Sequence, residues 1–182
     1  MLVIGTGPAA SRVARKCADA GWSVAVAEKR EYGGTCALRG CNPKKVFVRA
    51  AELLDWARRA NGKLVHCENA RINWTDLAGF KREFTQAIPE KSEQSFQTLG
   101  ITTLHGTARF LDHQVVQVGE TTVEARHILI ATGAKPAPLE FKGHEHVACS
   151  SDFMNLEQLP SRILFLGGGY ISFEFAHVAV RA

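Results

Sequence analysis

Residues 1–29 read MLVIGTGPAASRVARKCADAGWSVAVAEK, and this stretch decides the fold. Residues 2–5 are an apolar run that meets glycine, which predicts a buried strand entering a turn. Over residues 8–20 apolar side chains recur at helical spacing, and residues 23–27 predict a second buried strand that ends at Glu28. A strand, a helix and a strand in so short a span predict a βαβ unit with parallel strands.

The turn between the first strand and the helix reads Gly5-Thr-Gly7-Pro-Ala-Ala10. The first glycine permits a tight turn, the second lets the backbone approach a pyrophosphate, and the small Ala10 lets helix and strand pack closely. The helix N-terminus presents unpaired N–H groups to the phosphates. Glu28 ends the second strand, where its carboxylate can accept hydrogen bonds from a ribose. Together these features favour a dinucleotide site over a purely structural turn.

The rest of the sequence predicts further elements with less precise boundaries. A β-meander is expected over 101–123, because short apolar runs alternate there with turn residues. The run 127–131 predicts a buried strand that returns to the main sheet. The other expected elements are a helix over 44–59, a helix over 76–99 capped by Thr75 and kinked at Pro89, a linker over 134–146, a strand over 163–166 and a closing helix that follows three glycines.

A second motif reads Gly33-Gly-Thr-Cys36-Ala-Leu-Arg-Gly-Cys41-Asn-Pro-Lys44-Lys45. Two cysteines at this spacing can close a small disulfide ring if the backbone folds back. The lysines and the start of a helix would stabilise a thiolate. The alternatives are two unrelated buried thiols, or a metal site completed by residues 66–67, although that spacing matches no common zinc or iron–sulfur pattern. We expect no metal.

Composition narrows the class of protein. The chain has 182 residues, a formal net charge of +4 and scattered charges, which gives no support for nucleic-acid binding. No apolar stretch is long enough to span a membrane, and the first residues do not form a signal peptide. The five cysteines are an odd number, which argues against a structural disulfide scaffold and favours a reducing, cytoplasmic setting.

The motifs resemble those of the pyridine nucleotide–disulfide oxidoreductases, the family of glutathione reductase, dihydrolipoamide dehydrogenase and mercuric reductase. The resemblance extends along nearly the whole chain. It rests on the glycine turn, Glu28, the cysteine motif and three later segments, which are residues 127–133 (HILIATG), 150–152 (SSD) and 166–174 (LGGGYISFE).

The resemblance implies an α/β fold with two domains. Residues 1–142 would form a Rossmann-like FAD-binding domain, a parallel sheet with an inserted β-meander. Residues 143–182 would begin a second Rossmann-like domain that binds NAD(P). The histidine that serves as acid–base catalyst in the family lies in a later segment that has no match here. We therefore expect this chain to be an N-terminal fragment that is inactive alone, and the full-length protein to be a homodimer.

The resemblance also implies a role for each matched residue. Cys36 would attack a disulfide substrate, and Cys41, bonded to Cys36 in the resting state, would lie against the flavin. Lys44 would lie near the flavin with Glu174 as its partner. The remaining implied contacts to FAD are Gly5, Gly7, Pro8, Ala9, Glu28, Gly34, Thr35, Gly106, Ala108, Thr132 and Gly133, and those to the nicotinamide nucleotide are Gly167, Gly169 and Tyr170.

Within the family, several details favour the glutathione-reductase branch. Residues 38–41 (LRGC), the sequence Pro43-Lys44-Lys45 and Tyr170 resemble glutathione reductases, whereas Asn42 departs from the usual valine or isoleucine. The expected activity is reduction of glutathione disulfide by NADPH through FAD, in the service of cell redox homeostasis, and NADH is not excluded. Lipoamide-like, trypanothione-like and mercuric substrates stay open as alternatives, as does a non-catalytic FAD-binding or redox-sensing role.

Overall fold

The structure is a computed structural model that describes all of residues 1–182. Packing divides the chain into two compact units. The first comprises residues 1–38 and 86–137, and the second comprises residues 39–85 and 138–182.

The first unit is built on a four-stranded parallel sheet of order β3-β2-β1-β7. Its strands are β1 (Leu2–Ile4), β2 (Ala25–Glu28), β3 (Thr102–His105) and β7 (Ile128–Ile130). β1 lies in the middle, with Val3 opposite Val26 on one side and Leu129 on the other. The expected βαβ opening and the return of 127–131 to the main sheet are confirmed.

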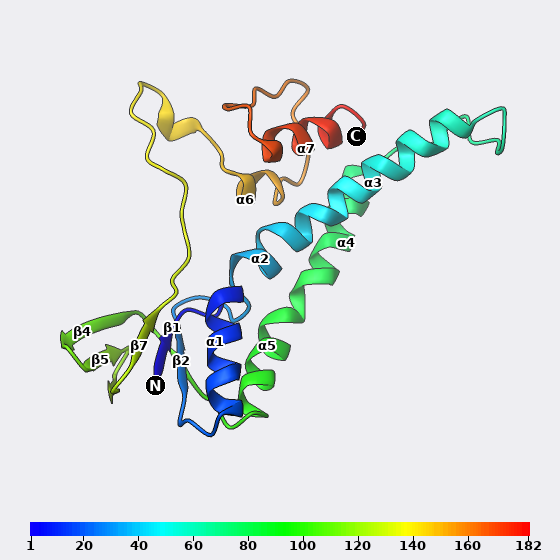
Figure 1. Ribbon diagram of the computed structural model, residues 1–182. Coiled ribbons are helices and arrows are strands. Elements are labelled where there is room, and N and C mark those ends of the chain that lie inside the picture. The colour runs from blue at the N-terminus through cyan, green and yellow to red at the C-terminus, as the bar shows by residue number, and fades with distance from the viewer. The chain divides into compact units, whose positions relative to one another are not determined.

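Helices cover one face of this sheet and a second sheet covers the other (Figure 1). On the helical face, α1 (Pro8–Asp19) and α5 (Ile88–Gln97) bury Ala10, Ala14 and Phe96 against the strands. On the opposite face, Val116 and Val118 pack on Leu2 and Ile4. These valines belong to an antiparallel sheet of β4 (Ala108–Asp112), β5 (Val115–Val118) and β6 (Thr121–Glu124). The short α2 (Gly34–Leu38) ends the first part of this unit.

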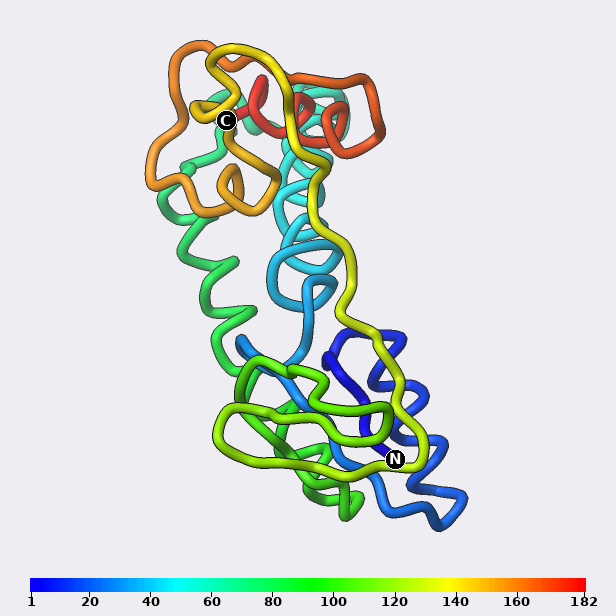
Figure 2. The backbone as a smooth tube through the Cα atoms, turned by 90° about the vertical axis from the view of Figure 1, so that its left-hand side faces the viewer, coloured from blue at the N-terminus to red at the C-terminus, as the bar shows by residue number.

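The second unit is helical. α3 (Cys41–Ala60) and α7 (Tyr170–Ala179) lie side by side, joined by α4 (Trp74–Gln86) and α6 (Ser150–Phe153) around a core of aromatic rings. The rings of Phe153 and Phe175 lie 4.4 Å apart between centroids. Most of the chain between residues 138 and 169 follows an irregular path, with one turn of 3-10 helix at His144–His146 (Figure 2).

Two cationic side chains of the second unit, Arg181 and Lys81, have hydrogen-bond partners. Arg181 Nη2 donates a hydrogen bond to Asp55 Oδ1 at 3.0 Å, and this bond lowers the pKa of the Asp55 carboxyl. Lys81 is buried, and burial lowers the pKa of its ammonium, which donates to the Oδ1 atom of Asn155 at 2.8 Å.

The structure corrects the expected helices in two places. The helix expected from residue 44 begins at Cys41, because Pro43 in the first helical turn lacks only an N–H that would have no helical partner. The helix expected over 76–99 is two helices, since α4 ends at Gln86 and Pro89 lies in the first turn of α5. The expected cap at Thr75 is wrong, because the Thr75 N–H donates to Asn73 Oδ1 and Asn73 therefore caps α4.

Two strand expectations are also corrected. The run that was expected to begin the meander is β3, which pairs in parallel with β2, so the meander consists of β4, β5 and β6 alone. The strand expected over 163–166 does not form, and Leu164 is 93% exposed. All strands of the two sheets lie in the first unit, so this run has no neighbour to complete its backbone hydrogen bonds. The domain assignment over 1–142 and 143–182 stays a prediction.

No helix of the structure has both the length and the apolar character needed to cross a membrane.

Replacement of Gly5 tests the close backbone contact between Gly5 and Ala131 at the edge of the sheet. Gly5 has a φ of +110°, and a Cβ there would lie 2.3 Å from the Ala131 carbonyl oxygen. Gly5→Ala should therefore destabilise the chain by roughly 3 kcal/mol or more, which lowers Tm by about 6–12 °C or prevents folding. Gly7→Ala is the matched control, because Gly7 has a φ of −67° and its Cβ would meet nothing within 4 Å. Thermal unfolding followed by circular dichroism measures both, and equal Tm values for the two variants would contradict this account.

Candidate nucleotide and redox site

The predicted nucleotide-binding residues gather at one edge of the first unit. Parallel strands end at the same edge of a sheet, so the segments that follow β1, β2, β3 and β7 meet there. The matched residues of these segments are Gly5 and Gly7 after β1, Glu28 at the end of β2, Gly106 after β3, and Thr132 and Gly133 after β7. Backbone bonds connect these segments directly, with Gly5 N–H donating to Ala27 O and Gly106 N–H donating to Glu28 O.

The glycine turn leaves space for a phosphate group. Gly7 is the N-cap of α1 and makes no side-chain capping bond, and Pro8 and Ala9 in the first helical turn are exposed. The helix N-terminus therefore keeps free N–H groups at an open backbone surface, which is what a pyrophosphate requires. These residues fit the diphosphate of a dinucleotide such as FAD.

Glu28 is fixed by hydrogen bonds rather than by a cation. Its Oε2 atom accepts a bond from the Thr6 hydroxyl at 2.7 Å, and its Oε1 atom accepts from the N–H groups of Lys29 and Arg30. Sequence reasoning missed Thr6, which occupies a variable position of the motif. The one signal was a hydroxyl between two glycines.

The cysteine motif begins against the nucleotide turn. A Cβ at Gly34 would lie 2.4 Å from the Gly7 Cα, so the two glycine turns pack backbone against backbone. Thr35 is exposed in α2, and Cys36 is half-buried in the same helix. The start of α2 is thus held directly against the predicted pyrophosphate turn.

Cys41 lies in the second unit, where it is the exposed first residue of α3. Neither Cys36 nor Cys41 forms a disulfide in the structure, so the bonded resting state implied by the resemblance stays a prediction. The other three cysteines have structural contacts. Cys17 packs on the core of the first unit, Cys67 Sγ donates to Ala57 O, and Cys149 caps α6, where its bonds to Asp152 lower the pKa of that carboxyl. No cluster of three or more metal-ligating side chains is present.

Lys44, Glu174 and Tyr170 come together in the second unit. The Lys44 ammonium forms an ion pair with Glu174 Oε2 and lies 4.6 Å from the centroid of the Tyr170 ring. The Lys44 side chain is 12% exposed, so its charge is largely removed from water and its partner matters. Gly167 and Gly169 lie in the exposed turn before α7, and Gly169 is the N-cap of that helix. The roles of all five residues toward cofactors stay predictions.

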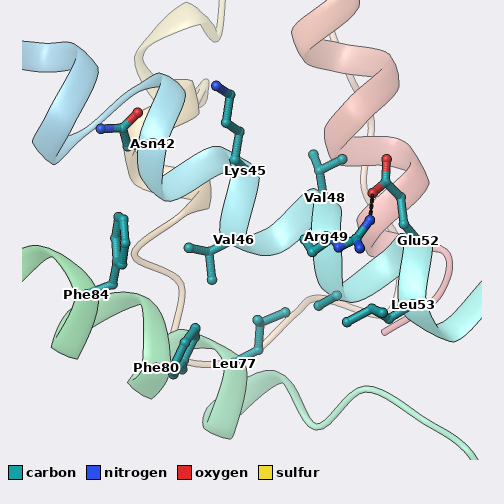
Figure 3. A pocket seen from close by; sticks show the side chains of 11 residues that line it. Asn42, Lys45, Val46, Val48, Arg49, Glu52, Leu53, Leu77, Phe80 and Phe84 are labelled. Atoms are coloured by element: carbon teal, nitrogen blue, oxygen red, sulfur yellow. Dashed lines mark hydrogen bonds and ion pairs between the residues drawn. The ribbon is translucent and has the colours of Figure 1, made fainter.

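A groove of about 750 Å³ lies between α3 and α4 (Figure 3). The first residue that lines it, Asn42, follows Cys41 directly in the sequence. Its walls are mainly apolar, and Phe80 and Phe84 of α4 face Val46 of α3 across it. Lys45 adds a positive charge, and Arg49, one turn later on α3, pairs with Glu52 at 3.2 Å within the same lining. No sequence motif marks this groove, although Phe80 and Phe84 have the spacing of one helical face.

Comparison with known proteins agrees with this geometry. The family described as "Pyridine nucleotide-disulphide oxidoreductase" matches residues 1–182. A glutathione reductase from Burkholderia cepacia is 34% identical over 178 residues, which is 98% of this chain and 40% of that protein. Dihydrolipoyl dehydrogenase 2 from Haloarcula marismortui is 31% identical over 188 residues, which is 98% of this chain and 39% of that protein.

A solved structure is also similar. The HOCl-induced flavoprotein disulfide reductase RclA from Escherichia coli matches with a TM-score of 0.83 and 27% sequence identity, over 99% of this chain and 39% of that one. The likeness confirms the expected α/β fold with a parallel sheet and a separate antiparallel sheet. The chain spans about 40% of the length of the curated relatives it matches.

The ion pair of Lys44 can be tested through stability. Glu174→Gln leaves the largely buried ammonium without an anion and should lower the free energy of unfolding by about 1–2 kcal/mol. Glu52→Gln is the control, because Glu52 pairs with Arg49 at the surface and its loss should cost under about 0.5 kcal/mol. Urea unfolding followed by tryptophan fluorescence reports on this unit, since the buried Trp74 packs in its core. Similar losses in both variants would show that the buried position of Lys44 does not matter.

Proposed function

The chain belongs to the pyridine nucleotide-disulphide oxidoreductase family, and from that premise we propose that it forms the FAD-binding and cysteine-bearing part of an FAD-dependent NAD(P)H:disulfide oxidoreductase. One observation carries the proposal. The segment with Cys36 starts in contact with the glycine turn, because Gly34 packs on Gly7 and Cys36 follows Gly34 by two residues. A dinucleotide held at the turn would therefore lie beside the start of the redox segment.

The proposed FAD site uses the sheet edge. The backbone of Gly5, Gly7, Pro8 and Ala9 holds the pyrophosphate, and Glu28 accepts a hydrogen bond from the adenosine ribose. The remaining proposed contacts are Gly34, Thr35, Gly106, Ala108, Thr132 and Gly133. When bound, FAD supplies hydride acceptance from a reduced nicotinamide and two-electron delivery to a disulfide.

The two cysteines divide the work on the substrate. The Cys36 thiolate attacks one sulfur of the substrate disulfide, which forms a mixed disulfide and releases one thiolate. Cys41 then attacks the sulfur of Cys36, which releases the second thiol and closes the Cys36–Cys41 disulfide. Two electrons from the reduced nicotinamide nucleotide, which bound FAD would pass on, and two protons then return both thiols.

The Lys44 ion pair and the last glycine turn serve the electron donor. Lys44, held by Glu174, places a positive charge where it stabilises reduced flavin, and Tyr170 covers the nicotinamide pocket. Gly167 and Gly169 open the pyrophosphate site of the nicotinamide nucleotide. NADPH is the proposed donor, and NADH is retained as the alternative.

Glutathione disulfide is the proposed substrate. Support comes from residues 38–41 (LRGC), Lys44-Lys45 and Tyr170, which resemble glutathione reductases, and from the glutathione reductases among the relatives. The positive charge of Lys45 in the α3–α4 groove suits a substrate that carries carboxylates, whereas Arg49 is paired with Glu52 there. Dihydrolipoamide or a mercuric substrate is the alternative, since dihydrolipoyl dehydrogenases are similar at 31–32% identity. We further propose a homodimer in the cytoplasm that binds no nucleic acid.

A second candidate function is a non-catalytic FAD-binding or redox-sensing role. The exposure of Cys41 favours it, because an accessible thiol at a helix N-terminus can respond to oxidants without turnover.

Reductive titration separates the two candidates. The chain loaded with FAD and given two electrons from dithionite should absorb at long wavelength, because the Cys41 thiolate then lies against the flavin ring. Cys41→Ser should abolish this absorption, and Cys149→Ser, which alters a thiol at α6, should leave it unchanged. Absorption that persists in Cys41→Ser would refute the assignment of Cys41. FAD binding with no such absorption in the unaltered chain would favour the redox-sensing role.

Turnover provides a second test. We expect the 182-residue chain alone to reduce no disulfide at a rate above background, because the family's acid–base histidine has no match in it. The same residues within a full-length protein should oxidise NADPH with glutathione disulfide at least tenfold more efficiently than with lipoamide, a difference of about 1.4 kcal/mol. NADPH consumption at 340 nm measures both, and preference for lipoamide would overturn the substrate assignment.

A further inference from the structure

Thr6 is a buried hydroxyl at the meeting point of three segments. Its side chain is 3% exposed, although most of its neighbours in the turn are open to solvent. The Oγ1 atom donates to Glu28 Oε2 at 2.7 Å and accepts from the Gly33 N–H at 3.2 Å. One hydroxyl therefore joins the glycine turn, the end of β2 and the loop that leads to α2. Only a side chain that both donates and accepts can make this connection.

The hydrogen bonds of Glu28 leave one place for a ligand. Each carboxylate oxygen can accept about two hydrogen bonds. The Oε1 atom already accepts from the N–H groups of Lys29 and Arg30, at 3.0 and 3.1 Å. The Oε2 atom accepts from Thr6 alone. Thr6 thus fixes the rotation of the carboxylate and leaves the second acceptor position of Oε2 for an incoming hydroxyl.

The bond from Gly33 connects this carboxylate to the cysteine segment. Gly33 has a φ of +122° and is followed by Gly34, whose backbone packs on Gly7. Without the Thr6 oxygen, the Gly33 N–H loses the partner that holds this strained turn in place. The orientation of Glu28 and the position of the turn before Cys36 therefore depend on the same oxygen atom.

We propose that Thr6 is a positioning residue of the nucleotide site, which orients Glu28 to accept one ribose hydroxyl and ties that carboxylate to the loop that leads into α2, the helix of Cys36. The inference rests on the proposed function, in which Glu28 binds the adenosine ribose. The family resemblance does not point to Thr6. The Glu28 carboxylate, held in this way, binds one ribose hydroxyl rather than two.

Ribose analogues test this role without any enzymatic turnover. Affinities of the chain for ADP and for 2′,3′-dideoxy-ADP are measured by isothermal titration calorimetry in the unaltered protein and in Thr6→Val. The valine has the same shape but neither donates nor accepts. We expect Thr6→Val to raise the Kd for ADP about tenfold more than the Kd for the dideoxy analogue, because the lost bond to Glu28 acts through the ribose hydroxyls. Thr6→Ser should restore the Kd for ADP.

The matched control is Thr98→Val, which removes a hydroxyl that bonds Gln94 O at the end of α5 and should change neither affinity. Thr6→Ala carries the same expectation as Thr6→Val and replaces it if the valine variant does not fold. Equal losses for both analogues would mean that Thr6 only stabilises the fold, and no loss for ADP would mean that it has no role. Either result overturns this inference alone. An unaltered chain that binds neither FAD nor ADP overturns the proposed function as well.

Titration with 2′-deoxy-ADP and 3′-deoxy-ADP tests the single acceptor position. One of the two analogues should bind like ADP and the other about tenfold more weakly. Equal weakening by each missing hydroxyl would show that Glu28 accepts from both, and would refute the count of one free position.

Discussion

The carboxyl edge of the parallel sheet is assembled from backbone contacts so close that no side chain fits between them. Gly5 lies against the Ala131 carbonyl, Gly34 against Gly7, and Gly106 against the backbone of Gly119. Each contact joins two segments that are separated in sequence. Because these approaches need glycine, backbone N–H groups at this edge can lie close to a phosphate.

Two carboxylates of the chain are held in opposite ways. Glu28 has no cationic partner, and a hydroxyl and two backbone N–H groups satisfy most of its acceptor capacity. Glu174 instead neutralises the ammonium of Lys44. The first arrangement keeps a negative charge that can accept a neutral hydroxyl. The second arrangement supports a positive charge that is largely out of water. The same residue type therefore serves as a hydrogen-bond acceptor in one unit and as a counter-ion in the other.

Much of the first unit could be predicted, because its local patterns decide its structure. A buried run that meets Gly5, followed by a helical repeat and Glu28, allows little else. The predictions were wrong where the structure of a segment depends on its partner elsewhere in the chain. A short apolar run such as β3 does not show which sheet it joins, and residues 163–166 form a strand only beside another strand. Thr6 was missed because its importance comes from Glu28 and Gly33, and no periodicity marks such a position.

The position of β1 has a consequence for synthesis of the chain. Leu2 pairs with Ala25 on one side and with Ile128 on the other, so β1 is made long before its second neighbour, β7. A nascent chain on the ribosome therefore carries an apolar strand with one unpaired edge until the segment of β7 has emerged. Assembly of this sheet depends on distant contacts, which form slowly, and the exposed edge is a natural place for a chaperone to bind.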